Sequence, residues 1–158
     1  MSASTKTRAA GLFTRPGFMV RRLHQIYVSI YLQECAAFGT TPVQSSVMQV
    51  LLLTPGIDQA ALAAEIGVDR TTTSNVLARL EKRGLVRREA DAEDKRLRRA
   101  FLTEQGEAML AEMQDALDRA HGRLVAPLSP DERDAFARSL RVLVEANNDE
   151  GRSALRML

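Results

Sequence analysis

The sequence predicts a mainly helical protein with one small β-hairpin, and three observations support this prediction. Only 4% of the 158 residues are aromatic and 45% are hydrophobic, with Leu and Ala abundant, a composition that favours helices. Apolar residues recur at three- and four-residue steps over most of the chain, and capping residues precede several of these stretches. Residues 85–102 differ, because two short strand-like runs there enclose a charged loop.

A chain of this length can bury a hydrophobic core without disulfides or metals. Its single cysteine cannot form an intramolecular disulfide, which fits a reducing compartment. No stretch approaches the ~18–20 continuous apolar residues of a membrane span, and residues 1–15 lack the apolar segment of a signal peptide. We therefore expect a cytoplasmic protein with no membrane partner.

The first half of the chain predicts a loose arm followed by two helices. Residues 1–14 are too polar and small to pack. Pro16 can start a helix that runs to about Phe38 and is stopped by Gly39. Thr41, followed by a proline, can cap a second helix. The Pro55-Gly56 dipeptide ends this helix.

Two short capped helices come next. Asp58 and Asp69 can cap helices over residues 59–66 and 70–83, and a glycine follows each of them. Two such helices joined by a tight turn form a helix-turn-helix.

A β-hairpin and two long helices complete the chain. Strands over residues 85–89 and 98–102 enclose the charged loop and form a wing. Thr103 can cap a long helix, and a capping box that starts at Ser129 opens the last one, which reaches about Ala146. The predicted fold is therefore a winged helix-turn-helix.

The predicted domains are an arm (1–14), a DNA-binding lobe (41–103) and a dimerisation region (15–40 and 104–158). The first and last helices are apolar over more than one face, and few other elements can cover that surface. A second copy is the natural cover, so we expect a homodimer.

Positive charge is concentrated in one segment, although the net charge is only +2. Residues 70–99 carry ten Lys and Arg against five Asp and Glu, and both flanking stretches, 25–69 and 100–158, are net acidic. Such a block favours a surface that faces a polyanion. The alternative is an ordinary solvated charged face.

Helix 70–83 has one face suited to a DNA groove. At 100° per residue, Thr73, Leu77 and Leu80 form an apolar face, and the opposite face has short hydrogen-bonding side chains, cations and no acid at its centre. Asn and Arg can read purine edges, and Thr or Ser can contact bases or phosphates. A solvated amphipathic helix is the alternative. The predicted DNA contacts are Arg70, Thr71, Thr72, Ser74, Asn75, Arg79 and Lys82 on the helix, and Lys95, Arg96 and Arg98 in the wing.

The wing combines cations with two acids. An Arg-tipped loop can enter the narrow minor groove. Asp91 and Asp94 would repel phosphates, so we expect them to pair with Arg96 or a nearby arginine and to hold the shape of the loop.

The helix-turn-helix and wing residues resemble the MarR family of transcriptional regulators. The specific resemblance lies within residues 56–106, and the order of elements is similar over nearly the whole chain. The residues that carry it are Leu80-Glu81-Lys82-Arg83-Gly84-Leu85-Val86 with the helix before it, and the wing pattern Asp91-x-x-Asp94-x-Arg96 followed by Leu102-Thr103-x-x-Gly106.

The resemblance implies a homodimer whose first, fifth and sixth helices interlock and whose two lobes read a pseudo-palindromic double-stranded DNA operator. Its recognition helix would be 70–83, and its wing arginine Arg96. This sequence differs from many members in one wing position, because it has Glu93 where they carry a basic residue between the two wing aspartates. Most members are repressors that a small ligand releases, often a phenolic or aromatic carboxylate bound between the dimer helices and the DNA-binding lobe.

The N-terminal run from Arg15 to Ile26 is similar to members that control aromatic-acid degradation, some of which respond to the acid or its CoA thioester. His24, Tyr27 and Tyr31 share one helical face, and Arg21 or Arg22 could bind a carboxylate on an aromatic body. The alternative is a dimer-interface helix whose His and Tyr side chains are satisfied core residues.

Alternative functions depend on a few particular residues. Cys35 could sense peroxides, as a first-helix cysteine does in some MarR relatives, but the helix C-terminus and Glu34 disfavour its thiolate. His24, His121 and Cys35 are too far apart for a metal site. No catalytic or cofactor motif is present, so we expect neither an enzyme nor a cofactor. The remaining alternative is a winged-helix module that binds another protein. Such a module would favour an acidic or apolar recognition face, and the face of helix 70–83 is polar and cationic.

Overall fold

The computed structural model describes residues 11–94 and 97–150. Its elements are η1 (Gly11–Thr14), α2 (Pro16–Glu34), η2 (Ala36–Phe38), α3 (Pro42–Leu53), β1 (Ile57–Asp58), α4 (Gln59–Glu65), α5 (Arg70–Lys82), β2 (Val86–Ala90), β3 (Arg98–Leu102), α6 (Glu104–Val125), α7 (Pro130–Ala146) and η3 (Asn148–Glu150).

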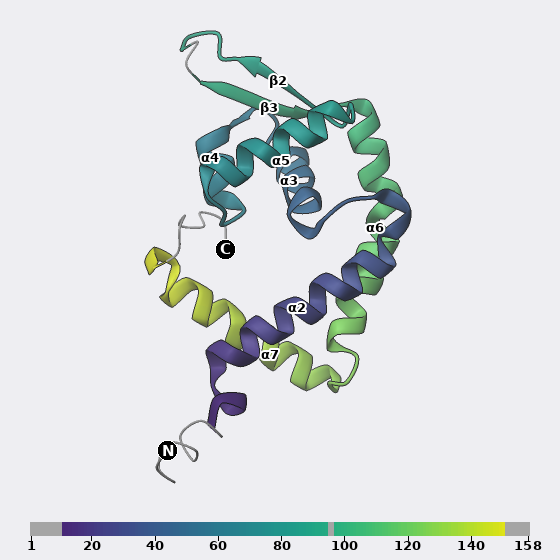
Figure 1. The fold of residues 1–158 in the computed structure, drawn as a ribbon, viewed down its shortest axis with the longest axis vertical. Coiled ribbons are helices and arrows are strands. Elements are labelled where there is room, and N and C mark those ends of the chain that lie inside the picture. Colours follow the sequence, from purple (N-terminus) through teal and green to yellow (C-terminus); the bar gives the residue numbers. More distant parts are fainter. Residues whose placement is uncertain (1–10, 95–96, 151–158) are drawn as a thin grey trace, which may run out of the picture.

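The predicted fold class is confirmed. Helices α3, α4 and α5 and the β2–β3 hairpin form one lobe, and α6 leads away from it along one side of the molecule (Figure 1). Helix α2 packs against α6, and α7 lies at the end of the molecule remote from the hairpin (Figure 1). No helix among the described residues is both long and apolar enough to cross a membrane.

The sheet has three antiparallel strands in the order β1-β3-β2. Val86 lies opposite Leu102 in the hairpin. The strand β1, which was not predicted, pairs Ile57 with Ala100. Its two residues are too few to show strand alternation in the sequence, so only the tertiary pairing reveals it.

Five helices begin at the residues whose side chains were predicted to cap them. The capping side chains of α3, α4, α5, α6 and α7 accept hydrogen bonds from backbone amides of the first turn. These caps are Thr41, Asp58, Asp69, Thr103 and Ser129.

The first helix is shorter than predicted. It ends at Glu34, and a 3-10 turn then continues to Phe38, a common way for a helix to tighten at its C-terminus. Gly39, with φ 60°, ends that turn in the left-handed conformation.

One hydrophobic core joins the lobe to the α2–α6 pair. Helix α7 has no buried residue. The largest fully buried side chains are Tyr31, Met48, Leu51, Leu62, Leu77, Leu80, Leu85 and Met113.

Candidate nucleic-acid interface and ligand cavities

The start of α5 is fixed by Asp69. One carboxylate oxygen accepts a hydrogen bond from the backbone amide of Thr72 (2.8 Å), and the other accepts one from the Thr72 hydroxyl (2.7 Å). These bonds hold the pKa of Asp69 below its usual value. The carboxylate is therefore ionised where the helix dipole favours negative charge.

The inner face of α5 is occupied by the core. Thr73, Leu77 and Leu80 are all fully buried, and the Thr73 hydroxyl donates to the backbone carbonyl of Asp69 at 3.0 Å. This packing sets the rotation of the helix about its axis and turns the opposite face outward.

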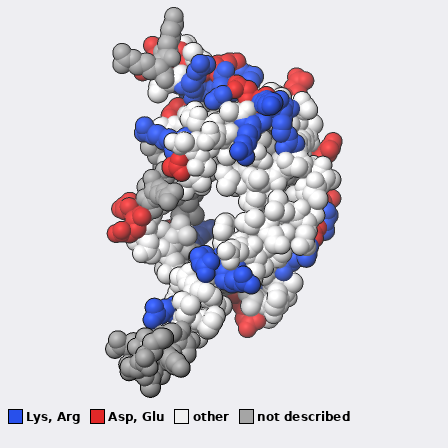
Figure 2. Space-filling model, in the orientation of Figure 1, with Lys and Arg blue, Asp and Glu red and all other residues white. Residues whose placement is uncertain are grey.

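The outward face carries the residues predicted to contact DNA. Ser74 and Thr72 are half-buried, and the Thr72 hydroxyl is engaged in the cap. The exposed members of the predicted set are Arg70, Thr71, Asn75, Arg79 and Lys82 on α5, and Arg98 in β3. Lys and Arg side chains gather over α5 and the hairpin (Figure 2).

Several cations of the basic segment are paired with acids of the same chain. Arg88 forms an ion pair with Glu81 at 2.5 Å. Arg87 pairs with Glu89, and its guanidinium lies 4.2 Å from the centre of the Phe101 ring. Within the described part of the chain, Arg70, Arg79 and Lys82 make no ion pair, so α5 leaves positive charge available to a partner.

Asp91 organises the wing. Its carboxylate accepts hydrogen bonds from the backbone amides of Asp94 and Glu93, both at 2.9 Å, and forms an ion pair with Arg99. The amide of Asp94, then Arg99 and then the amide of Glu93 lower the pKa of Asp91 to about 2. Of the wing residues predicted to contact DNA, Lys95 and Arg96 lie outside the described residues.

A cavity of about 460 Å³ lies between α2, the end of α6 and α7. The Tyr27 ring at its wall stacks on His121, with ring centres 5.3 Å apart. No Lys or Arg of the described chain lines it. The lining residues are Pro16, Met19, Val20, Leu23, His24, Tyr27, Leu124, Phe136 and Leu140.

The structure separates the five residues predicted to bind a ligand. His24 and Tyr27 line the cavity. Tyr31 is fully buried in the core, with its hydroxyl 2.8 Å from that of Thr40. Arg21 is exposed and its guanidinium lies 5.4 Å from the centre of the Phe18 ring. Arg22 is exposed and does not line the cavity.

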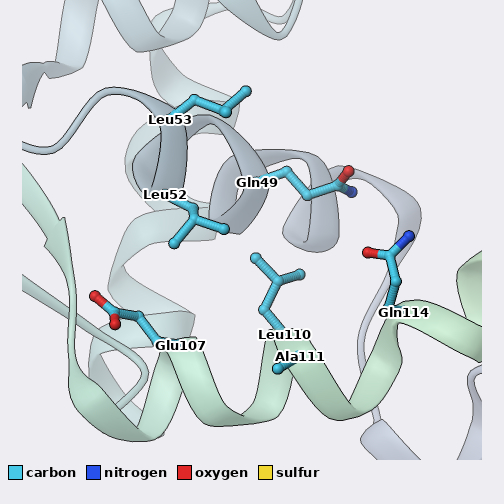
Figure 3. A pocket seen from close by; sticks show the side chains of 7 residues that line it. All are labelled: Gln49, Leu52, Leu53, Glu107, Leu110, Ala111 and Gln114. Carbon is cyan, nitrogen blue, oxygen red and sulfur yellow. The ribbon is translucent and has the colours of Figure 1, made fainter.

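A second cavity, of about 650 Å³, lies between α3 and α6. Gln49 and Gln114 lie toward one end, Glu107 lies at the other, and leucines lie between them (Figure 3). Sequence reasoning missed this cavity because its two walls are distant in the chain and each resembles ordinary helix surface. The lining residues are Gln49, Leu52, Leu53, Glu107, Leu110, Ala111 and Gln114.

Cys35 lies in the core, with 1% of its surface exposed. Burial raises the pKa of its thiol, and the charge of Glu34 raises it further. Both effects disfavour a reactive thiolate. Among the described residues, no group of His, Cys, Asp and Glu could hold a metal ion.

Comparison with known proteins places this architecture among regulators of transcription. A family profile described as MarR family matches residues 38–97. The transcriptional regulator HosA of Escherichia coli O157:H7 is 38% identical over 125 residues, which cover 79% of this chain and 91% of HosA.

Two solved structures are similar over most of their length. The transcriptional repressor CouR, bound to a 23-mer DNA duplex, is 30% identical with a TM-score of 0.80, covering 85% of this chain and 95% of CouR. BpsR of Bordetella bronchiseptica, whose DNA binding is regulated by 6-hydroxynicotinic acid, is 26% identical with a TM-score of 0.78, covering 82% of this chain and 92% of BpsR.

Proposed function

Because this chain belongs to the MarR family of transcriptional regulators, we propose that it represses transcription by binding a pseudo-palindromic operator as a homodimer. In this proposal an aromatic acid or its CoA thioester binds the dimer and releases the DNA. Membership of the family identifies a transcriptional regulator and not an enzyme.

The outward face of α5 is the single observation that carries the DNA-binding part. Its exposed cations make no ion pair with described residues, and Asn75 and Thr71 beside them are free of the core. In the major groove Arg79 and Asn75 would read base edges, and Lys82 would contact a phosphate. An acidic or apolar face would have favoured a protein partner, and this face is neither. CouR, which has a similar fold, was solved on a DNA duplex.

Apolar side chains that the protomer leaves uncovered support the proposed dimer. On α7 the exposed fractions of Val142 and Leu143 are 61% and 55%, and on α2 those of Met19 and Val20 are 52% and 55%. Such a run of exposed apolar residues marks an interaction surface. Two copies joined by these helices would present two α5 helices to successive turns of DNA.

The cavity between α2, α6 and α7 supports the ligand part. Its volume is within the range of small-molecule sites, and its apolar wall suits an aromatic ring. His24 at its wall would face the carboxylate, and neither Arg21 nor Arg22 lines the cavity to supply a cation. BpsR offers a precedent, since an aromatic acid regulates its DNA binding.

The DNA-binding part can be tested by selecting binding sites from random DNA duplexes and measuring affinity over a range of salt concentrations. We expect an inverted-repeat site bound by two chains, with an affinity that falls steeply as salt rises because bound cations release counterions. Selection that yields no sequence, or binding without salt dependence, would contradict the proposal.

The effector can be sought by thermal shift with aromatic acids and their CoA thioesters, since a ligand that binds the folded state raises its melting temperature. A true effector must also release the selected operator. His24→Ala should weaken its binding, whereas Arg141→Ala, on the polar side of α7, should not.

A further inference from the structure

The last turn of the recognition helix α5 is attached to the end of the α2 segment by one side chain. The two terminal nitrogens of Arg83, the residue that follows α5, donate to the backbone carbonyls of Gly39 (2.9 Å) and Phe38 (2.8 Å). Among the hydrogen bonds of the described residues, no other joins α5 or its cap to the turn that ends α2. A planar guanidinium that bonds two carbonyls fixes direction as well as distance.

The two residues that follow Arg83 are attached to the start of α6 by Thr103, the residue that caps this helix. The Thr103 hydroxyl donates to the carbonyl of Gly84 (2.6 Å), and the Thr103 amide donates to that of Leu85 (3.1 Å). Gly106 packs so closely that a β-carbon added there would lie 2.1 Å from the carbonyl oxygen of Leu85. The attachment to α6 is therefore short and rigid, whereas the attachment to α2 depends on one long, exposed side chain.

These two attachments hold the recognition helix to both long helices of the dimerisation region. The inner face of α5 packs against α3 and α4, and the α6 side is fixed by Thr103 and Gly106, so the remaining attachment of the last turn is the one to the end of the α2 segment. Arg83 is placed to set the tilt of α5, because its bonds cross directly from the end of α5 to the end of η2.

We propose that Arg83 is the positioning residue that sets the half-site spacing the dimer accepts. This inference rests on the proposed function, because it requires a dimer with two recognition helices on one operator. Half-sites read by such dimers lie about one helical turn apart, and each added base pair moves and rotates one half-site relative to the other. A dimer whose helices are held at one angle rejects the altered spacing, and a dimer whose helices tilt freely accepts it.

The competing role for an exposed arginine at the end of a recognition helix is a direct phosphate contact. The two roles differ in salt dependence. Loss of a phosphate contact reduces the salt slope by about one and weakens binding to all sequences and spacings alike. Loss of a positioning residue leaves the salt slope unchanged and alters only the preference among spacings.

The test uses the full-length protein and an operator selected from random DNA, with one base pair added or removed between its half-sites. For the wild type we expect about a tenfold loss of affinity at the altered spacings, equal to about 1.4 kcal/mol. Arg83→Gln should lose only about twofold at the same spacings, and Arg83→Lys, which can bond one carbonyl, should lie between.

Lys82→Gln, at the last residue of α5 and immediately before Arg83, is the matched control. It should weaken binding at every spacing, reduce the salt slope and keep the wild-type spacing preference. An equal loss at every spacing for Arg83→Gln would overturn the proposal and assign Arg83 to a phosphate. A wild type that binds no operator would instead defeat the proposed function.

A second measurement does not depend on DNA. A spin label at Ala78 on the exposed face of α5, in a Cys35→Ser background, reports the distance between the two recognition helices of the free dimer. Arg83→Gln should broaden that distance distribution, and Lys82→Gln should leave it as in the wild type. An unchanged distribution in Arg83→Gln would also overturn the proposal.

Discussion

Helices α5 and α7 are both amphipathic, but the protomer treats their apolar faces in opposite ways. On α5 the apolar face is fully buried and the polar face is exposed. On α7 no residue is buried, and Leu140, Val142, Leu143 and Val144 are exposed.

The difference shows how each helix can function. Since the core already covers the apolar face of α5, what remains exposed is a hydrogen-bonding, cationic face suited to DNA. On α7 the uncovered face is itself apolar, and burying it requires another molecule. One helix is completed by its own chain, and in our proposal the other is completed by a second copy.

Replacing a buried leucine of α5 should have the largest effect. Leu77→Ala removes fully buried methyl groups and should lower the free energy of unfolding by about 2–5 kcal/mol. Urea denaturation followed by circular dichroism measures this loss. If the loss in free energy of unfolding disappeared at high protein concentration, the stability of the lobe would depend on association. The apolar face of α5 would then not differ from that of α7.

Replacing a cation on the outward face of α5 should spare the fold and affect DNA. Arg79→Ala should reduce operator affinity by about 1–3 kcal/mol per half-site, because a bidentate contact to a base is lost. Fluorescence anisotropy with the selected operator and with a scrambled duplex measures the effect. Arg141→Ala removes the same charge from α7 and is the control; equal losses for both variants would contradict a specific contact.

The same leucine-to-alanine change on α7 should act through assembly. Leu143 is 55% exposed in the protomer, so covering it in a dimer would contribute roughly 1 kcal/mol per copy. Leu143→Ala should weaken self-association and leave the secondary structure intact. Sedimentation equilibrium of wild type and variant checks this, and unchanged association would remove this residue from the interface.

The smallest effect is expected at the wing. The pKa of Asp91 is lowered to about 2 in the folded protein from an ordinary value of 3.8. The ionised carboxylate therefore stabilises the wing fully above that ordinary value, and the contribution is lost as the pH falls toward 2. An NMR titration should show the Glu93 and Asp94 amides shifting near pH 2. Asp91→Asn should lack this transition, and a midpoint near the ordinary value would contradict the assigned contacts.

Much of the fold could be predicted because its signals are local. Each capping side chain bonds amides two or three residues away, so Asp58 and Asp69 revealed the two helices of the helix-turn-helix. The outward face of α5 was predictable too, because helical periodicity assigns it once Leu77 and Leu80 are taken as core.

The candidate sites were less predictable because they join distant segments. The periodicity of α2 placed Tyr31 on the face of His24 and Tyr27, but its contact with Thr40 places it in the core. Charge counting could not separate Arg88, which is paired with Glu81, from Arg79, which pairs with no described acid.

The sequence by itself determined where the helices begin, which face of α5 is buried, and the family to which the motifs belong. These features depend on hydrogen bonds and periodicities within a few residues. Only the tertiary structure decided which arginines pair with acids of the same chain, where the cavities lie, and that Arg83 joins α5 to the end of the α2 segment. The cavities and the Arg83 contact join segments more than 40 residues apart in the chain, whose proximity is set by the packed core and not by any local preference.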